Sequence, residues 1–228
     1  MLSYPRTYYA TLLAVVMHAA GAVGIVLGWG QLFSQLTPFN LLTMLGLIIW
    51  TAPQRNRSFF LFLLVAFLTG LSTEIIGVNT SILFGHYQYG SAFGPKLMGV
   101  PLLIGINWFV VVYSSGMVAI QIRKWTIAFL ENQKIPGMSK WVEISAAING
   151  ALMATGFDYL MEPAAVKLRF WNWDGGEIPM LNYVSWFGIS FLLMILFTRL
   201  KFTLQPFAIY LLIIQVIFFQ LVLNLSVH

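Results

Sequence analysis

The chain has no cysteine and few histidines, and both scarcities narrow the chemistry it can perform. The missing cysteine excludes disulfides, thiolate catalysis, iron–sulfur clusters and cysteine–zinc sites. Only His18, His86 and His228 could serve as imidazole ligands, which is too few for a histidine-rich di-iron site. Oxygen-dependent membrane hydroxylase chemistry is therefore not expected, and the sequence predicts neither a metal nor another cofactor.

Several functional motifs are absent as well. No aspartate-rich diphosphate motif is present, which argues against an intramembrane prenyltransferase, and no glycine fingerprint of a dinucleotide-binding fold is present. A retinal protein needs a buried lysine, yet the last apolar stretch has only Lys201 at its entrance. The formal net charge of +5 resides in loops, where it reflects membrane topology, so no nucleic-acid partner is expected.

The composition is that of a membrane protein. Hydrophobic residues make up 59% of the chain and charged residues 8%, whereas a soluble domain is about 25% charged. A spanning helix needs about 20 mostly apolar residues. We predict an all-α integral membrane protein, a single domain over residues 1–228 with about seven transmembrane helices. The predicted helices are 8–29, 37–52, 58–76, 98–122, 141–160, 180–198 and 203–226.

Basic residues predict the orientation of this bundle. If all seven stretches cross, nine Lys and Arg residues fall on one side, while Lys96, Lys167 and Arg169 fall on the other. Because cytoplasmic loops are enriched in Lys and Arg, we expect a cytoplasmic N-terminus and an external C-terminus. The expected location is the inner (cytoplasmic) membrane of a prokaryote. No small-residue cleavage site follows the first stretch, so it is expected to be a retained helix.

Two long aromatic loops are predicted on the external side, at residues 77–97 and 161–179. Long irregular segments in compact proteins tend to be functional. Each loop follows an apolar stretch that ends near an acid. Each leads to a segment in which proline and tryptophan are seven positions apart, Pro101–Trp108 and Pro179–Trp186. The similarity indicates either a parallel internal repeat or chance resemblance between short apolar segments.

Glu74 and Asp158 are the first candidates for catalysis. Each lies near the C-terminal end of a predicted membrane helix, where burial and the negative end of the helix dipole both disfavour an ionised carboxylate. A carboxylic acid that keeps its proton near neutral pH can act as a donor, and an ionised neighbour can act as a base. The alternative is that both acids are structural, held by Lys, Arg or Tyr partners.

The two loops supply further candidates. His86 could shuttle protons to Glu74, while Tyr87 and Tyr89 could line a substrate pocket; the alternative is an interfacial aromatic belt. In the second loop, Trp171 and Trp173 could stabilise a passing cation through their ring faces. The other candidates are Asp174 and Glu162 for acid–base chemistry or water positioning, and Asn107 and Asn182 for orienting water or a hydroxyl group. The alternatives are an amphipathic surface segment that meets lipid headgroups for the second loop, and hydrogen bonds between helices for the two asparagines.

Five segments together resemble a known family. These segments are EIIG from Glu74, FGHYQYG from Phe84, KLMGVPLLIGINW from Lys96, DYLMEP from Asp158 and WNWDGGEIPMLNYVSWF from Trp171. In order and spacing they are similar to the CruF-type carotenoid 1,2-hydratase family of membrane proteins in carotenoid biosynthesis. The resemblance covers the chain from about the third to the sixth predicted helix.

The resemblance implies a hydro-lyase without a redox cofactor. Such an enzyme adds water across the terminal C1=C2 double bond of an acyclic carotenoid. Protonation of C2 generates a tertiary cation at C1, and a water molecule deprotonated by a base captures it. The implied partners are a lipophilic carotenoid, water and membrane lipid. On this basis the candidate catalytic residues are Glu74, Asp158, Asp174 and His86, with donor and base left open.

Two other functions fit the same residues. A carotenoid cyclase would make the same protonation but would let the chain's own double bond capture the cation. A non-catalytic carotenoid carrier or proton-coupled transporter would have the same aromatic pocket, because buried acids can also carry protons. The particular carotenoid, the number of ends that react and the oligomeric state stay open.

Overall fold

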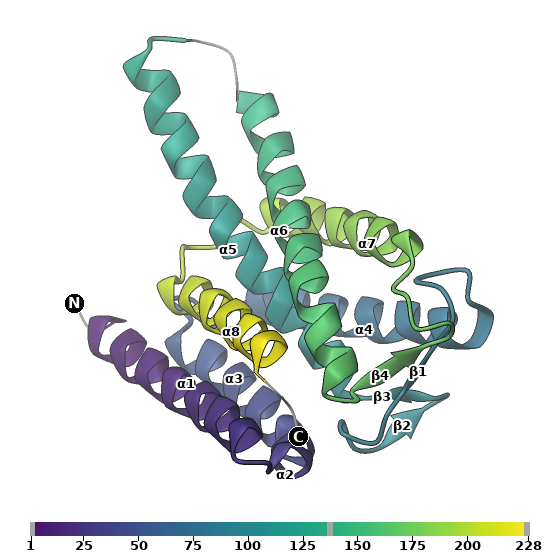
Figure 1. Cartoon of the computed structure of the whole chain (residues 1–228). Helices are drawn as coiled ribbons and strands as arrows, with labels where there is room; N and C mark the ends of the chain where they lie inside the picture. Colours follow the sequence, from purple (N-terminus) through teal and green to yellow (C-terminus); the bar gives the residue numbers. More distant parts are fainter. Residues whose placement is uncertain (1–2, 136–138, 226–228) are drawn as a thin grey trace.

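The computed structural model describes residues 3–135 and 139–225 of the chain (Figure 1). Within these residues the fold is helical, with four short strands. The helices are α1 Ser3–Val26, α2 Gly30–Gln35, α3 Thr37–Thr51, α4 Arg57–Thr80, α5 Leu103–Asn132, α6 Ser139–Lys167, α7 Met180–Arg199 and α8 Pro206–Asn224. The strands are β1 Tyr87–Tyr89, β2 Lys96–Leu97, β3 Val100–Pro101 and β4 Trp171–Trp173.

The prediction of a helical membrane protein is confirmed, but the count of seven spans is not. Five helices in the described part are long and apolar enough to cross a membrane: α1, α4, α5, α7 and α8. The apolar helix α3 has 15 residues, short of the about 20 that a bilayer requires. Helix α6 is long, but its polar residues keep it outside this group.

Helices α5 and α6 form a long hairpin that organises the molecule (Figure 1). Helix α4 packs on α5 and α7 packs on α6, while α1 and α8 pack together and α8 also contacts α5 and α6. Every residue of α5 from Trp108 to Met117 is buried. This segment is therefore the centre of the hydrophobic core, and the candidate site lies at its N-terminal end.

Local sequence explains where the key helices begin and end. Helix α4 starts after Asn56, whose side-chain Oδ1 accepts a hydrogen bond from the Phe59 amide at 3.1 Å, as an N-cap residue should. It ends at Ser81, which takes a left-handed conformation with φ 58°. Helix α6 was expected to end near residue 160, yet it continues through Pro163 to Lys167. The extra turn places Glu162 on the helix.

The two aromatic loops are connected to each other by a small sheet. Strand β1 pairs antiparallel with β4, in the register Tyr87 with Trp173 and Tyr89 with Trp171. Side chains alternate between the two faces of a strand, so these four aromatic residues share a buried face, while the central Gln88 and its partner are exposed. A second pairing, β2 with β3, forms the hairpin that leads into α5.

Candidate active site

Glu74 is held by three hydrogen-bond donors. Its side chain is buried, with 5% of its surface exposed. The Tyr87 and Tyr89 hydroxyls both donate to Oε2, the latter at 2.7 Å, and Trp108 Nε1 donates to Oε1 at 2.9 Å. Buried polar groups are normally satisfied in this way. The donors come from β1 and α5, so the sheet and the core helix jointly fix this carboxyl group.

Glu162 occupies a similar position under the other strand. It is 3% exposed. Trp171 Nε1 and Trp173 Nε1 donate to its Oε2 at 2.9 and 3.0 Å. Indole N–H groups can only donate, so two donors converge on one oxygen. Two aromatic side chains of β1 thus donate hydrogen bonds to Glu74, and two aromatic side chains of β4 donate to Glu162.

Asp158 differs from these two acids because it is only partly satisfied. Its side chain is fully buried on α6. Asn182 Nδ2, from α7, donates to Oδ2 at 2.7 Å. Within the described residues Oδ1 has no hydrogen-bond partner, although it too is buried. An unsatisfied buried oxygen calls for an explanation, such as an ordered water or a catalytic role.

The three carboxyl groups line one small cavity. Its volume is about 20 Å³, which exceeds the roughly 10–15 Å³ needed for one water molecule. Helices α4 to α7 and both strands β1 and β4 contribute to the walls. The lining residues are Glu74, Phe84, Tyr87, Tyr89, Ile104, Asn107, Asp158, Met161, Glu162, Trp171, Trp173, Asn182 and Trp186.

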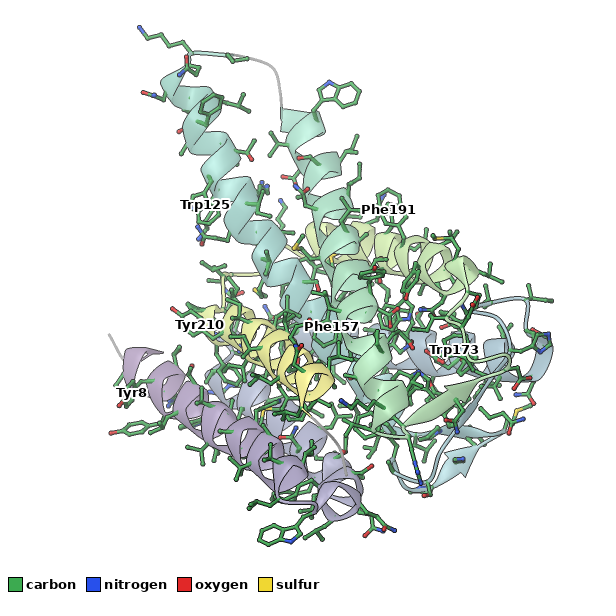
Figure 2. All side chains as sticks on the ribbon, viewed as in Figure 1. Tyr8, Trp125, Phe157, Trp173, Phe191 and Tyr210 are labelled. Atoms are coloured by element: carbon green, nitrogen blue, oxygen red, sulfur yellow. The ribbon has the colours of Figure 1, made fainter. Side chains whose placement is uncertain are left out.

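A larger, mostly apolar cavity adjoins the small one. Its volume is about 260 Å³, and it lies among α1, α2, α3, α5, α6 and α8. Asn107, Met161 and Trp171 line both cavities. In Figure 2, Phe157 lies on the side of α6 that faces α8, and it lines the larger cavity, whereas Trp173, on β4, lines the small one. An apolar chain in the larger cavity could therefore present its end to the carboxyl groups.

The two tyrosines remain hydrogen-bond donors over a wide pH range. Burial raises the pKa of Tyr87 above its ordinary value, and the negative charge of Glu74 raises it further. The same two causes raise the pKa of Tyr89. A tyrosinate here would be desolvated and would face a carboxylate. Both hydroxyls therefore keep the protons with which they hold Glu74.

Most of the predicted site residues are brought together. Those that line the small cavity are Glu74, Asp158, Tyr87, Tyr89, Asn107, Trp171, Trp173 and Asn182. His86 and Asp174 lie outside it: both are exposed, and the His86 ring instead hydrogen-bonds to Ser81 Oγ at 2.7 Å. The cause is strand alternation. Each directly adjoins a strand residue that faces inward, Tyr87 and Trp173 respectively, and therefore faces outward.

Sequence reasoning underrated Glu162 and missed two tryptophans. Glu162 follows Asp158 by four positions, the spacing that places two side chains on one helix face. Trp108 and Trp186 stack face to face, with ring centroids 3.8 Å apart and an interplanar angle of 4°. Gly70 makes room for Trp108, since a Cβ atom there would lie 2.3 Å from the indole ring. The equal spacing of both tryptophans from a proline was the available signal.

The comparison with known protein families decides the assignment. The model of a family described as carotenoid biosynthesis protein matches residues 35–227. This range covers most of the chain and all of the cavity-lining carboxyl groups. The chain belongs to the carotenoid biosynthesis protein family. The expected relationship to membrane proteins of carotenoid biosynthesis is thus confirmed.

The chain is also similar to a protein whose name states an activity. It is the bisanhydrobacterioruberin hydratase of Haloarcula japonica, which is 24% identical over 186 residues. The alignment covers 76% of this chain but 59% of that protein, so the relative is considerably longer. No solved structure matches the chain significantly.

Proposed function

We propose that this member of the carotenoid biosynthesis family is a hydratase that adds water to the terminal C1=C2 bond of an acyclic carotenoid. One observation carries the proposal: a cavity with room for one water, lined by three buried carboxyl groups, adjoins a larger apolar cavity. Hydration needs a proton donor, a positioned water and an apolar binding site for the chain. The hydratase name of the relative supports the same reaction class.

Asp158 is the proton donor in this proposal. Three carboxyl groups that share a nearly dry cavity cannot all be ionised, because like charges repel strongly there. Asp158 receives one donated hydrogen bond, whereas Glu162 receives two and Glu74 three. The least stabilised carboxylate is the one that retains a proton. Its unpartnered Oδ1 is the atom from which the proton passes to C2 of the substrate.

Glu162 is the base that activates water. Its Oε2 accepts both indole N–H groups, which leaves Oε1 available to a water in the cavity. When C2 takes the proton from Asp158, C1 becomes a tertiary cation. Water oxygen bonds to C1 while Glu162 accepts the released proton, so the product is a tertiary alcohol. Transfer of that proton from Glu162 to Asp158, one helical turn away, restores the starting state.

The aromatic walls and Glu74 stabilise the cation. Tyr87, Trp171 and Trp173 line the cavity, and ring faces attract a cation, most strongly in desolvated sites. Glu74 is fixed as an acceptor by its three donors and supplies negative charge. Such preorganised groups are often the largest contribution to catalysis. This arrangement assigns Glu74 a stabilising role and leaves proton transfer to Asp158 and Glu162.

The larger cavity holds the end segment of the substrate. Its volume of about 260 Å³ is slightly below the roughly 300–1,000 Å³ of pockets that enclose drug-sized ligands. A whole carotenoid therefore extends beyond it, and an extended polyene is soluble only in the bilayer. We expect the whole chain to act as one domain in the inner membrane of a prokaryote, with the N-terminus cytoplasmic.

An internal two-fold repeat accounts for the arrangement of the site. The units are α4–β1–α5 and α6–β4–α7. The β1–β4 pairing is centred on Gln88 and Asn172, as an antiparallel pair related by a two-fold axis requires. The stacked Trp108 and Trp186 lie at matching positions in the two units. Under this relation Glu74 corresponds to Asp158, and β1 corresponds to β4.

Expression in a host that accumulates an acyclic carotene such as lycopene tests the function. The expected product is an alcohol whose mass exceeds that of the substrate by one water, and the variant Asp158→Asn should not form it. A product of unchanged mass with a cyclic end group would identify a cyclase instead. Unaltered pigment in a host with verified protein in its membrane would contradict both enzymatic functions and favour a carrier.

A further inference from the structure

A third cavity lies away from the candidate active site. Its volume is about 790 Å³, and it is formed by α5, α6, α7 and the turn after α7. No residue lines both this cavity and either of the two described above. Its lining residues come from Gly116 to Arg123 on α5, from Glu143 to Ala147 on α6, and from Phe191 on α7 to Phe202 beyond that helix. They include Arg123, Arg199 and Lys201, which belong to the basic residues that predict the cytoplasmic side.

Both apolar and charged residues line this cavity; the apolar ones are called the floor and the charged ones the rim. Small and aromatic side chains, such as Ala119, Ala147 and Phe191, provide the floor. Three cations and one carboxylate line it: Arg123 from α5, Glu143 from α6, Arg199 at the end of α7 and Lys201. The rim therefore carries two net positive charges. That combination fits an anionic amphiphile rather than a neutral lipid or a small polar solute.

Arg123 has unused hydrogen-bonding capacity at this rim. One of its terminal nitrogens, Nη2, donates to Glu143, which links α5 to α6. Its Nε is buried and has no acceptor within the described residues. A guanidinium has five donors in a fixed fork and suits phosphate geometry. A phosphate group of a ligand at the rim would supply the missing acceptor.

We propose that this cavity binds an anionic phospholipid. The phosphate lies among Arg123, Arg199 and Lys201, and an acyl chain lies along the apolar floor between α5, α6 and α7. Basic pockets between membrane helices recognise lipid headgroups in this way. With two net positive charges at the rim, a doubly charged lipid such as cardiolipin is bound more tightly than singly charged phosphatidylglycerol, and phosphatidylcholine is bound least. The site is independent of the proposed hydratase activity.

Lipid binding to the purified, detergent-solubilised protein tests the proposal, with native mass spectrometry and thermal stability as readouts. The double variant Arg199→Gln, Lys201→Gln should bind cardiolipin about 10- to 30-fold more weakly, since each cation near a lipid surface contributes about a factor of five. The matched control is Arg55→Gln, Arg57→Gln, which removes the same charge from residues outside the cavity. It should leave binding unchanged.

Two further measurements complete the test. Glu143→Gln raises the charge of the rim and should tighten cardiolipin binding, which no general loss of folding would mimic. Inorganic phosphate and diphosphate should neither stabilise the protein nor displace the lipid. Equal losses in both double variants, no preference among the three lipids, or displacement by diphosphate would overturn the proposal.

Discussion

Hydrogen bonding distinguishes three carboxyl groups that are otherwise equally buried. Glu74, Asp158 and Glu162 line the same cavity, yet they accept three, one and two donated hydrogen bonds. In a low-dielectric site each such bond stabilises the ionised form. The three acids can therefore divide the roles of charge stabiliser, proton donor and base. In the proposed mechanism Asp158 is the donor, because its Oδ1 has no hydrogen-bond partner within the described residues.

Removing the carboxyl proton of Asp158 is the sharpest test at the residue scale. Asp158→Asn preserves size and the contact with Asn182 but cannot donate a carboxyl proton, so turnover should fall by about 10²- to 10⁴-fold. Asp174→Asn is the matched control. Asp174 is exposed and lies outside the cavity, so the turnover of this variant should stay near that of the unmodified protein. Product formation rates in membranes measure both. Comparable rates for Asp158→Asn and the unmodified enzyme would rule out the donor assignment.

The raised pKa values of Tyr87 and Tyr89 predict their behaviour in alkaline solution. An exposed tyrosine ionises near pH 10, whereas these two should stay protonated at pH of about 11 because of burial and Glu74. The double variant Tyr87→Phe, Tyr89→Phe should thus show the same tyrosinate absorbance at that pH as the unmodified protein. Loss of absorbance equal to two tyrosines would show that both are accessible and ionised.

Single residues also show how much of the site can be predicted from the sequence. Glu74 and Asp158 are identifiable because acids in apolar stretches are costly and therefore functional candidates. Tyr87, Tyr89, Trp171 and Trp173 face inward, as expected for residues that line a pocket. The outward positions of His86 and Asp174 follow from strand pairing between segments 84 residues apart in the chain. No local pattern reveals such a pairing, which is why both were expected in the site.

At the element scale, the sheet between β1 and β4 brings the two loops together. It aligns two tyrosines over Glu74 and two tryptophans over Glu162. Helix α6 contributes both Asp158 and Glu162 because it does not end near residue 160 but continues through Pro163 to Lys167. That extension was not predictable from the proline alone, since proline usually ends or kinks a helix. Its last residue, Lys167, hydrogen-bonds to the carbonyls of Val222 and Leu223 on α8.

Close packing between α4 and α5 yields a prediction about glycine. A Cβ atom at Gly70 would lie 2.3 Å from Trp108, which cannot retreat because it stacks on Trp186 and bonds to Glu74. Gly70→Ala should destabilise the protein by about 1–3 kcal/mol through overpacking. Gly46→Ala on α3 is the control, since nothing lies within 4 Å of its Cβ position. Thermal unfolding in detergent measures both, and equal stability of the two variants would contradict the packing.

At the scale of the whole molecule, the site lies at one end of the bundle. Its carboxyl groups lie near the C-terminal ends of α4 and α6. The cationic cavity proposed for a lipid is lined by the opposite ends, with Glu143 near the start of α6 and Arg199 at the end of α7. The sequence predicts this polarity through its basic residues. The count of seven spans is not confirmed, because α3 is shorter and α6 more polar than the five helices of the described part that meet both requirements.

Because the chain has no cysteine, a single introduced cysteine can report on which side of the membrane each end of the bundle lies. Helix α4 has 24 residues, which corresponds to about 36 Å at 1.5 Å per residue. Arg55 precedes it, and Asp174 lies beside the strands that follow it. We expect Arg55→Cys to react with an impermeant maleimide only from the cytoplasmic side and Asp174→Cys only from the outside. Labelling of both from the same side would contradict the topology.

Incorporation of water oxygen into the product tests the central claim most directly. Membranes that contain the protein are supplied with an acyclic carotene in heavy-oxygen water, and the product is analysed by mass spectrometry. The account predicts a tertiary alcohol that carries the heavy oxygen, formed by the unmodified protein and lost in Asp158→Asn. An unlabelled product, or a labelled alcohol formed equally by Asp158→Asn, would contradict it.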